Sequence, residues 1–361
     1  DYELKSKKDP LKLSVDINLQ HLIRNELIFA EEIFKNKGSA AILMNINNGE
    51  ILSMISLPDY DLNKREKIVN VNYINRATKA LYEMGSVFKT FTFAAGLNEG
   101  IIKVDTKFEN LEKKIECGEN TISEYDDKIP ANLTAEEILI RSGNIGSVRI
   151  SQKIGIEKYK LFLNKIGILE KIEFDIEEVA QPLPISWGKC KLATSSFGHG
   201  ITTTALQLLK GYAIISNGGY LISPTLVKYD NKDDFKSKKI LKDGVSKKVN
   251  KVLSKIVSSK DGTANFANVV GYNIGGKTGT AQKTIDGKYS KKKVNTFVSI
   301  FPHESPRFVL LVLLDEPEAN SEYVYNYRDG SNFKYKGNLR NTSGWTTVEI
   351  AGKIIEKIGP I

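Results

Sequence analysis

Sulfur and imidazole are scarce in this sequence, which has two cysteines and three histidines among its 361 residues. Cys117 and Cys190 do not form a C-x-x-C pair, and no compact group of histidines and cysteines is present. We therefore expect no metal site, and no sequence feature points to a cofactor. A disulfide between the two cysteines is compatible with an oxidising compartment, but the sequence does not determine whether it forms.

Long apolar runs are also lacking. The longest compact run, Phe308 to Leu314, is far shorter than the ~20 residues that a helix needs to cross a bilayer, and it predicts a buried strand. The chain starts at Asp1 with neither a methionine nor a basic and apolar leader. We expect it to be the trimmed soluble part of a larger protein, with residues 1–10 as a linker or the remnant of a removed domain.

Acidic residues are outnumbered, since 43 Asp and Glu stand against 52 Lys and Arg and give a formal net charge of +9. Lysine clusters occur in polar stretches at residues 236–239, 247–248 and 291–293, and we expect solvated surface loops there. The alternative is attraction to an anionic surface or polymer. Because the sequence has no zinc-finger spacing, RNA-binding aromatic signature or basic heptad region, nucleic acid is not an expected partner.

The hydrophobic fraction of 41% is that of a globular protein and excludes a wholly disordered chain. A hairpin is predicted from Ser39 to Ser56 about the turn Asn47-Asn48-Gly49. Other strands are expected at residues 11–15, 274–282, 295–301 and 308–314. Helices are expected at residues 19–28 (capped by Asp16 or Asn18), 83–97, 135–154 (broken at 142–144), 159–168, 204–216, 247–257 and 345–358. We expect a mobile polar loop at 318–343 and, since strands come from both chain ends, one sheet with an inserted helical lobe.

A serine and a lysine three residues apart, Ser86 and Lys89, share one face of the expected helix. A serine hydroxyl is a poor nucleophile until a base takes its proton, and a lysine can do so only if burial or nearby positive charge lowers its pKa. The same S-x-x-K spacing occurs at Ser186, Ser290 and Ser331, but only Ser86 follows a turn-forming glycine and precedes an apolar helix. The alternative is an ordinary helix cap beside a solvated lysine.

The second segment is Ser142-Gly143-Asn144. The Ser142 hydroxyl can relay a proton between a lysine and a leaving amine. The Asn144 amide can both donate to and accept from a substrate peptide group. The alternative is a helix break with a local side-chain cap.

The third segment, Lys277-Thr278-Gly279-Thr280, lies in a predicted strand. Gly279 leaves room for an extended substrate to pair with this strand through its backbone. The hydroxyls of Thr278 and Thr280, with the positive charge of Lys277, suit a substrate carboxylate. The backbone N–H of Thr280 can donate to an oxyanion. The alternative is a surface strand with glycine bends.

In this order the three segments match a signature shared by penicillin-binding proteins and class A β-lactamases. The middle segment is Ser-Gly-Asn rather than Ser-Asp-Asn, which argues against a class A β-lactamase. From Leu11 to Ile361 the chain resembles the transpeptidase domain of a class B penicillin-binding protein. Besides the three segments, the resemblance rests on residues 11–20, 38–54, 75–89 and 196–208. Tyr82-Glu83-Met84-Gly85 is similar to the division-specific branch, of the penicillin-binding protein 3 or FtsI type, although both branches commonly carry proline at the position of Met84.

The resemblance implies an α/β (α+β) fold, with helices flanking a mainly antiparallel sheet, an inserted helical lobe, and residues 11–361 as one transpeptidase domain. It implies these roles: acylated nucleophile, Ser86; general base, Lys89; proton relay, Ser142; substrate amide binding, Asn144; substrate carboxylate binding, Lys277, Thr278, Gly279 and Thr280; oxyanion hole, the backbone N–H groups of Ser86 and Thr280.

The resemblance further implies peptidoglycan stem peptides as substrates, β-lactam antibiotics as inhibitors, and no cofactor. For the full-length protein it implies an FtsW-type glycosyltransferase and other divisome proteins as partners. The expected location is the periplasmic face of the bacterial inner membrane, with a single-pass anchor and a non-catalytic pedestal domain that this chain lacks.

Three other functions are compatible with parts of this pattern. A β-lactamase or D,D-carboxypeptidase of the same fold needs a base for deacylation, and none is identifiable in the sequence. A non-catalytic penicillin sensor or assembly scaffold is the second. A Ser-His-Asp hydrolase is the third, but no Gly-x-Ser-x-Gly elbow is present, and we expect His199, in a glycine-flanked turn, to be structural.

Overall fold

The computed structural model describes residues 10–61, 63–64, 71–118, 120–229, 237–285 and 287–358. The linker expected at residues 1–10 therefore lies, except for Pro10, outside the described residues. The strands are β1 (Gly38–Asn45), β2 (Ile51–Leu57), β3 (Lys107–Phe108), β4 (Lys114–Cys117), β5 (Asn120–Ser123), β6 (Leu133–Thr134), β7 (Gly275–Ile285), β8 (Lys288–Phe301), β9 (Phe308–Asp315), β10 (Val324–Asn326) and β11 (Lys334–Lys336). The α-helices are α1 (Ile17–Phe34), α2 (Lys89–Asn98), α3 (Ala135–Ile140), α4 (Asn144–Ile154), α5 (Ile156–Lys165), α6 (Lys189–Ser195), α7 (Ala205–Ser216), α8 (Val245–Ser258) and α9 (Thr347–Ile358). The short 3-10 helices are η1 (Val71–Tyr73), η2 (Gly85–Phe88), η4 (Asn265–Ala267) and η5 (Ser343–Trp345).

The central sheet is antiparallel, and its five strands lie in the order β2-β1-β9-β8-β7. Its strands come from both ends of the chain, as the sequence predicted. The expected buried strand is β9, which lies between β1 and β8 and is buried along its whole length. A strand covered on both faces needs apolar residues at successive positions, which explains the uninterrupted apolar run. Strand β7 forms the edge, so one side of its backbone is open to another element or a ligand.

The hairpin of β1 and β2 is confirmed, with Gly49 at a φ of 81° in the turn between them. The N-terminal cap of α1 is Asp16, whose side chain accepts hydrogen bonds from the backbone N–H groups of Asn18 and Leu19. The strand expected at residues 11–15 is wrong, because this segment makes only a single bridge, from Leu13 to Val227.

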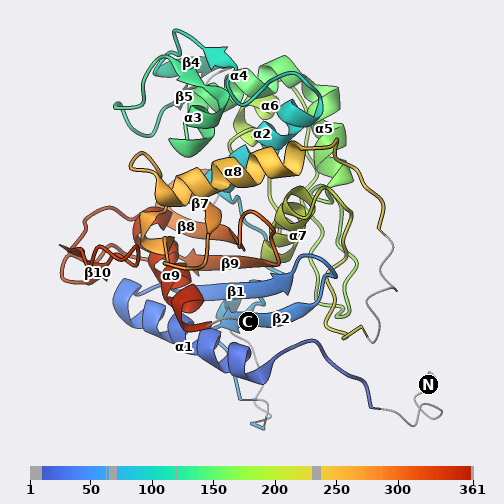
Figure 1. Cartoon of the computed structure of the whole chain (residues 1–361), viewed down its shortest axis with the longest axis vertical. Helices are drawn as coiled ribbons and strands as arrows, with labels where there is room; N and C mark the ends of the chain where they lie inside the picture. Colours follow the sequence, from blue (N-terminus) through green and yellow to red (C-terminus); the bar gives the residue numbers. More distant parts are fainter. Residues whose placement is uncertain are drawn as a thin grey trace.

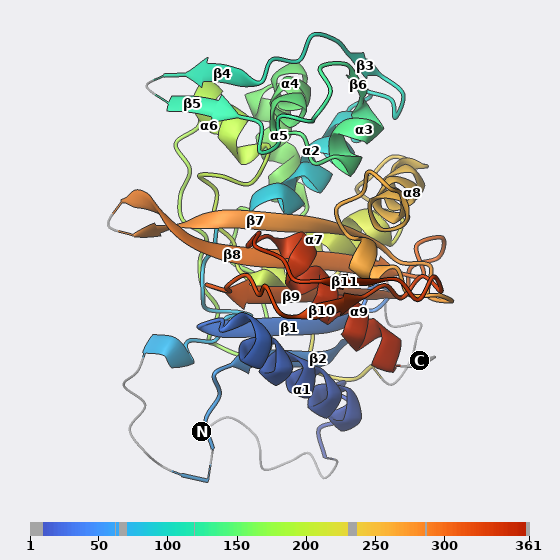
Figure 2. The same cartoon turned by 90° about the vertical axis from the view of Figure 1, so that its left-hand side faces the viewer.

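Helices cover both faces of the sheet. Figures 1 and 2 show α1 and α9 side by side on one face, where they contact β1, β2, β8 and β9, and α7 packs on the other face against β1, β8 and β9. Helix α8 runs along the edge strand β7. Beyond α8, at the top of both views, lies the helical lobe that contains β3–β6 and α3–α6.

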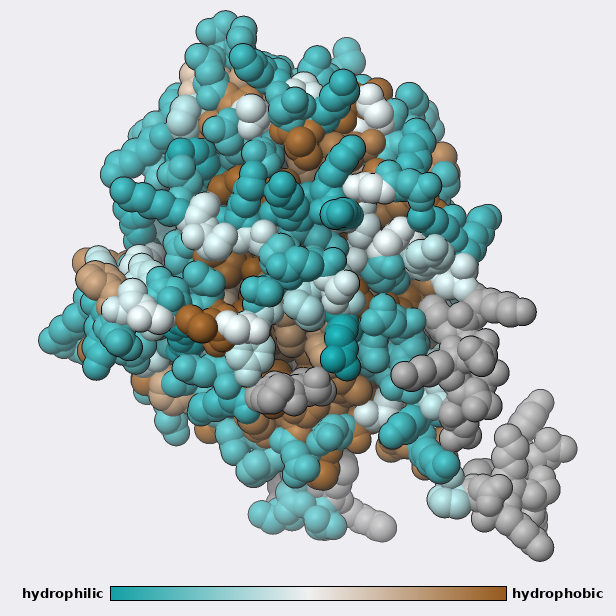
Figure 3. Space-filling model, viewed as in Figure 1, coloured by the Kyte–Doolittle hydropathy of each residue, from teal (hydrophilic) through white to brown (hydrophobic). Residues whose placement is uncertain are grey.

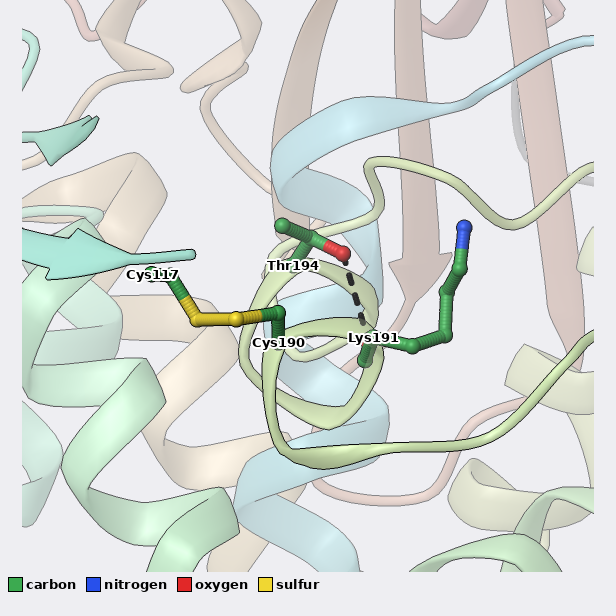
Figure 4. Close-up of a disulfide and its surroundings, with 4 residues drawn as sticks. All are labelled: Cys117, Cys190, Lys191 and Thr194. Carbon is green, nitrogen blue, oxygen red and sulfur yellow. Dashed lines mark hydrogen bonds between the residues drawn. A yellow bond between two sulfur atoms is a disulfide. The ribbon is translucent and has the colours of Figure 1, made fainter. Parts of the chain in front are cut away.

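The helical lobe is inserted between the strands of the sheet, as expected. Its helices α3 and α4 confirm the helical spacing at 135–154 with a break at 142–144. The two small sheets of the lobe, β3 with β6 and β4 with β5, were not predicted. Cys117 of β4 and Cys190 of α6 form a disulfide with a Cα–Cα distance of 5.4 Å (Figure 4). The sequence had left this bond open.

The segment 318–343 was expected to be a mobile polar loop. The structure instead has regular secondary structure in this segment. It contains the antiparallel hairpin of β10 and β11, and Tyr325 is fully buried. The ring of Tyr325 stacks on Phe266 at a centroid distance of 5.0 Å. Arg328 forms an ion pair of 2.9 Å with the buried Glu349 of α9. The aromatic residues of this segment, which the polar composition obscured, anchor it to the core.

The lysine clusters are exposed, but they do not all lie in loops. Lys247 and Lys248 lie on the solvent side of α8, and Lys291 and Lys292 lie on β8. Lys236 is outside the described residues. In the view of Figure 3, hydrophilic residues cover most of the face and apolar residues are exposed only in small groups. None of the helices in the described ranges combines the length and hydropathy of a bilayer-spanning segment.

Candidate active site

Ser86 lies in the 3-10 turn η2, directly before helix α2. The start of the predicted helix at Glu83 is wrong, because α2 begins at Lys89. Gly85 has a φ of 60°, a left-handed conformation that a right-handed helix does not contain. A Cβ atom at this position would lie 2.7 Å from the carbonyl oxygen of Thr280. The glycine therefore delays the helix and lets the Ser86 turn lie against strand β7.

Two more glycines allow backbone segments to meet beside Ser86. A Cβ atom on Gly279 would collide with the carbonyl oxygen of Met84, and one on Gly198 would collide with the carbonyl oxygen of Gly85. The N–H of Gly85 donates to the Gly198 carbonyl at 3.3 Å. Strand β7, the Ser86 turn and the loop after α6 thus approach one another as closely as bare backbone permits.

Ser142 lies in the turn between α3 and α4, and it has a φ of 60°. Glycine is the usual residue in the left-handed position after a helix, because a Cβ atom is disfavoured there. The contacts of Ser142 hold it in place: its N–H donates to the Leu139 carbonyl at 3.2 Å, and its own carbonyl accepts from Lys89 Nζ. Strained residues of this kind cluster at functional sites.

Two lysine amines meet at the hydroxyl of Ser142. Lys277 Nζ lies 2.8 Å and Lys89 Nζ lies 3.2 Å from Ser142 Oγ. Lys89 Nζ also donates to Asn144 Oδ1 at 2.7 Å. Both lysine side chains are buried, with 1% and 0% of their residue surface exposed for Lys89 and Lys277. The structure therefore joins residues from all three sequence segments in one cluster.

Burial changes the acid–base properties of this cluster. It lowers the pKa of Lys89 to about 7, while the carboxylate of Glu124 acts in the opposite direction. Burial also lowers the pKa of Lys277 well below its ordinary value, and the nearby Lys89 acts in the same direction. Because two ammonium ions around one buried hydroxyl repel each other, the site favours a neutral amine. A neutral amine beside a hydroxyl can accept its proton, as the S-x-x-K pattern requires.

Glu124 is a residue of this site that the sequence analysis missed. Its Oε2 accepts from the N–H of Asn144 at 2.7 Å, and its Oε1 accepts from the N–H of Ile145 at 2.9 Å. These N–H groups belong to the first turn of α4, where the N-cap residue Gly143 has no side chain to satisfy them. Glu124 follows strand β5 and is distant in sequence from α4, so no local signal marks its role.

Thr278 and Thr280 both line the cavity, since side chains two residues apart on a strand share one face. Thr278 Oγ1 lies 2.7 Å from Thr263 Oγ1. Thr280 Oγ1 accepts from the N–H of Ser343 at 2.9 Å. Because that contact uses the hydroxyl oxygen as an acceptor, the hydroxyl proton of Thr280 is free to donate into the cavity.

A cavity of about 910 Å³ lies between the helical lobe and β7. Five of the predicted site residues line it, namely Ser86, Ser142, Asn144, Thr278 and Thr280. The two lysines of the cluster are buried behind this wall. The expected oxyanion hole stays a prediction; the backbone nitrogen of Thr280 lies 3.3 Å from where a Cβ atom of Gly85 would be, one residue before Ser86.

His199 also lines the cavity, and its expected structural role stays a prediction. Its ring lies edge-on to Phe197 and Tyr289, at centroid distances of 5.1 Å and 5.7 Å. Burial and the nearby Lys89 lower the pKa of His199 to about 4. The imidazole is therefore neutral at neutral pH.

Other parts of the cavity wall were missed because no short motif marks them. The aromatic side chains of the wall are Tyr125, Phe197, Phe266, Tyr327 and Trp345, and its basic side chains include Lys293 and Arg340. Within the described ranges, no group of three or more His, Cys, Asp or Glu side chains is arranged to hold a metal ion.

A model of the family described as "Penicillin binding protein transpeptidase domain" matches residues 39–331. The chain is 32% identical over 360 residues to the "Probable peptidoglycan D,D-transpeptidase FtsI" of Caulobacter vibrioides, which covers 97% of this chain and 58% of that protein. It is also 32% identical over 324 residues to the "Peptidoglycan D,D-transpeptidase FtsI" of Buchnera aphidicola subsp. Baizongia pistaciae, covering 86% of this chain and 55% of that protein. A solved structure of the transpeptidase domain of Burkholderia pseudomallei penicillin-binding protein 3 has a TM-score of 0.78 and 25% identity, covering 95% of this chain and 94% of that domain.

The chain thus spans little more than half the length of these two curated relatives. It matches the solved domain over nearly the whole of both chains, and this confirms the expected fold of an antiparallel sheet with flanking helices. The FtsI and penicillin-binding protein 3 names of the similar proteins agree with the branch that Tyr82 to Gly85 indicated.

Proposed function

The chain belongs to the penicillin-binding protein transpeptidase family, and from this premise we propose that it is a serine-type peptidoglycan D,D-transpeptidase. One observation carries the proposal: the amines of Lys89 and Lys277 flank the hydroxyl of Ser142 behind the cavity that Ser86 lines. A buried lysine with a pKa of about 7 supplies a base near neutral pH. The names of the similar proteins support the same reaction class.

In the proposed acylation step, Ser86 Oγ attacks the carbonyl carbon of the D-Ala-D-Ala amide of a stem peptide. Neutral Lys89 takes the hydroxyl proton. The backbone N–H groups of Ser86 and Thr280 stabilise the oxyanion of the tetrahedral intermediate. The C–N bond then breaks, a proton passes to the leaving amine through Ser142, and D-alanine departs. An ester on Ser86 remains.

Substrate binding is assigned to the two walls of the cavity. The hydroxyls of Thr278 and Thr280, with Lys277 behind them, receive the terminal carboxylate. The oxygen of the Asn144 amide is occupied by Lys89, which differs from the expectation that it accepts from the substrate. One Nδ2 hydrogen of Asn144 donates to the Ser123 carbonyl at 2.8 Å, which leaves the second hydrogen for a carbonyl of the stem peptide.

In the second step an amine of a neighbouring stem peptide attacks the ester and forms the cross-link. β-Lactams acylate Ser86 in the same way and remain attached, because the retained ring fragment hinders deacylation. For the longer protein we propose a role in septal wall synthesis at the periplasmic face of the inner membrane, beside an FtsW-type glycosyltransferase and other divisome proteins. The FtsI names of the relatives support this part of the proposal.

Intact-mass analysis after incubation with a fluorescent penicillin tests the nucleophile. The parent chain is expected to gain the mass of one penicillin, and Ser86→Ala is expected to gain none. If the parent chain gains no adduct, or if Ser86→Ala still gains one, the assignment is wrong.

Two further measurements distinguish a transpeptidase from the alternative functions. Rapid turnover of nitrocefin would identify a β-lactamase rather than a transpeptidase. Cross-linking of a donor and acceptor pair of stem peptides is expected for the transpeptidase and not for a penicillin sensor or scaffold.

A further inference from the structure

The hairpin of β4 and β5 is a small element next to the catalytic cluster. It forms a two-stranded sheet of its own, and an isolated hairpin is marginally stable in water. Of its strand residues with a described exposure, only Ile122 is buried. The position of the hairpin therefore depends on anchors outside it.

The inner end of the hairpin is hydrogen-bonded to Asn144, whose side chain in turn contacts Lys89. The Ser123 carbonyl and the Glu124 carboxylate bind the side-chain amide and the backbone N–H of Asn144. The side-chain oxygen of Asn144, Oδ1, accepts a hydrogen bond from Lys89 Nζ at 2.7 Å. Two hydrogen bonds thus connect the hairpin to the amine of the proposed base, so a displaced hairpin changes the orientation of that amine.

The outer end of the hairpin is attached covalently. Figure 4 shows the bond from Cys117, at the end of β4, to Cys190 in the first turn of α6. Helix α6 packs against α4, and the segment after it is bound to α2, because Thr92 Oγ1 donates to the Ser196 carbonyl at 2.8 Å. Thr92 follows Lys89 by one helical turn. The disulfide therefore joins the hairpin to α6, and the segment after α6 is bound to α2, the helix that begins with Lys89.

We propose that the disulfide of Cys117 and Cys190 is a positioning device for acyl transfer. It holds the β4–β5 hairpin in the place where Ser123 and Glu124 orient Asn144 and, through it, Lys89. This inference rests on the proposed function. It predicts that Ser86 is acylated rapidly only while the disulfide is intact.

The charges around Lys89 give the proposal a second testable consequence, a change in the pH dependence of the acylation rate. Glu124 faces Lys89 from the end of β5, Lys277 from β7, and His199 from the loop after α6. Of these three, Glu124 is the one that favours the charged amine. Removing the charge of Glu124 while the burial stays therefore lowers the pKa of Lys89 and moves the acidic limb of the acylation rate to lower pH. A hairpin that moves away also exposes the amine, and because burial is the largest influence on this pKa, the limb then departs both from that of the parent and from that of a variant lacking only the charge.

The test compares three variants of the full chain. Cys117→Ser/Cys190→Ser removes the covalent anchor, and Glu124→Gln removes the charge while leaving the disulfide. The control is Leu27→Ala, since Leu27 is fully buried in α1, at the opposite end of the molecule from the hairpin (Figures 1 and 2). The rate of Ser86 acylation by a fluorescent penicillin is measured against pH, well below the unfolding temperature of each variant.

At its plateau the double cysteine variant is expected to acylate roughly tenfold more slowly, because a displaced catalytic group loses rate steeply. Its acidic limb is expected to differ from that of the parent, whereas that of Glu124→Gln, which keeps the burial of Lys89, is expected to move to lower pH. Leu27→Ala should keep the parent plateau and limb although it unfolds at a lower temperature. A loss of stability alone cannot produce this pattern.

Three results would overturn the proposal and leave the proposed function intact. The first is a folded double variant with the parent rate and the parent pH limb. The second is two free thiols in the parent chain purified without reductant. The third, used if the double variant does not fold, is an unchanged rate and limb after dithiothreitol converts the disulfide to two thiols and is itself oxidised to a cyclic disulfide. Failure of the untreated parent chain to acylate would instead contradict the proposed function.

Discussion

The central sheet and the helical lobe form opposite walls of one cavity, and different interactions hold each wall. In the sheet, β9 pairs along its whole length with β1 and β8, and every residue from Phe308 to Asp315 is buried. In the lobe, the wall includes the α3–α4 turn, whose left-handed Ser142 is bound by two lysines, and the loop Tyr125 to Lys128, which follows a hairpin anchored by Glu124 and a disulfide. Apolar burial dominates the first wall, and polar and covalent contacts dominate the second.

This difference separates stability from chemistry. Many apolar contacts together stabilise the sheet, so removing one lowers the stability of the whole fold without moving a catalytic atom far. In the lobe a few hydrogen bonds set the position and charge of one amine, and removing one changes the reaction before it changes the fold. The two walls meet at Ser142 Oγ, which contacts Lys89 on α2 and Lys277 on β7.

Lys89→Met should have the largest effect, and it should change the acylation rate far more than the stability of the fold. Loss of the proposed general base is expected to slow acylation by roughly 10²- to 10⁴-fold. The unfolding free energy should change by less than about 2 kcal/mol, because the cost of burying an amine disappears while its acceptors lose a donor. Penicillin acylation kinetics and urea unfolding measure the two quantities. A rate near that of the parent would remove Lys89 from the mechanism.

Leu311→Ala should have the opposite effect. Leu311 is fully buried in β9, and its truncation is expected to lower the unfolding free energy by about 2–5 kcal/mol. The acylation rate below the unfolding transition should remain near that of the parent. Leu161→Ala is the matched control, because Leu161 is 53% exposed and should change stability little. An acylation defect in Leu311→Ala would show that the two walls are not separable.

The acylation rate should rise with pH through neutrality. With the pKa of Lys89 at about 7, the neutral fraction of the amine grows roughly tenfold from about pH 6 to about pH 8. A protonated amine cannot accept the Ser86 proton, so the rate follows the neutral form. His199 does not titrate in this range, because its pKa is lowered to about 4. A rate that falls with pH would assign the charged lysine to the active form.

Thr134→Ala should have the smallest effect. Thr134 and Glu137 form a capping box at the start of α3 in the lobe, and its loss is expected to cost about 1 kcal/mol without changing acylation. Thr204→Ala removes the equivalent cap of α7, beside the sheet, and should cost more because Thr204 is fully buried. Urea unfolding of both variants compares the two regions directly. Equal losses would contradict the view that burial makes the sheet side more sensitive.

Much of the framework was predictable because its signals are local. The apolar run of β9, the Asn-Gly turn after β1 and the 3.6-residue spacing of the helices each depend on neighbours within a few residues. The helix expected from Glu83 starts late because Gly85 bends the chain toward Thr280, a contact between distant segments. The polar composition of 318–343 concealed Tyr325, whose partner Phe266 lies outside that segment.

The residues of the candidate site divide in the same way. The serine, lysine, asparagine and threonine positions were recognisable from short spacings that match a known signature. Glu124 was not recognisable, since a glutamate after a strand has no local feature that distinguishes it. The position of His199 at the cavity was not recognisable either, because a glycine-flanked turn does not reveal which side chain faces a cavity.

By itself the sequence determined most strands of the central sheet, most of the longer helices and the chemical types that meet at the site, because these depend on spacings of a few residues. Only the tertiary structure decided that two amines share one hydroxyl, that a glutamate caps α4 and that two cysteines 73 residues apart are joined. The physical reason is that the pKa of an amine, the capping of a helix by a distant carboxylate and the pairing of thiols depend on burial and on distances between remote segments. These quantities exist only once the chain has folded.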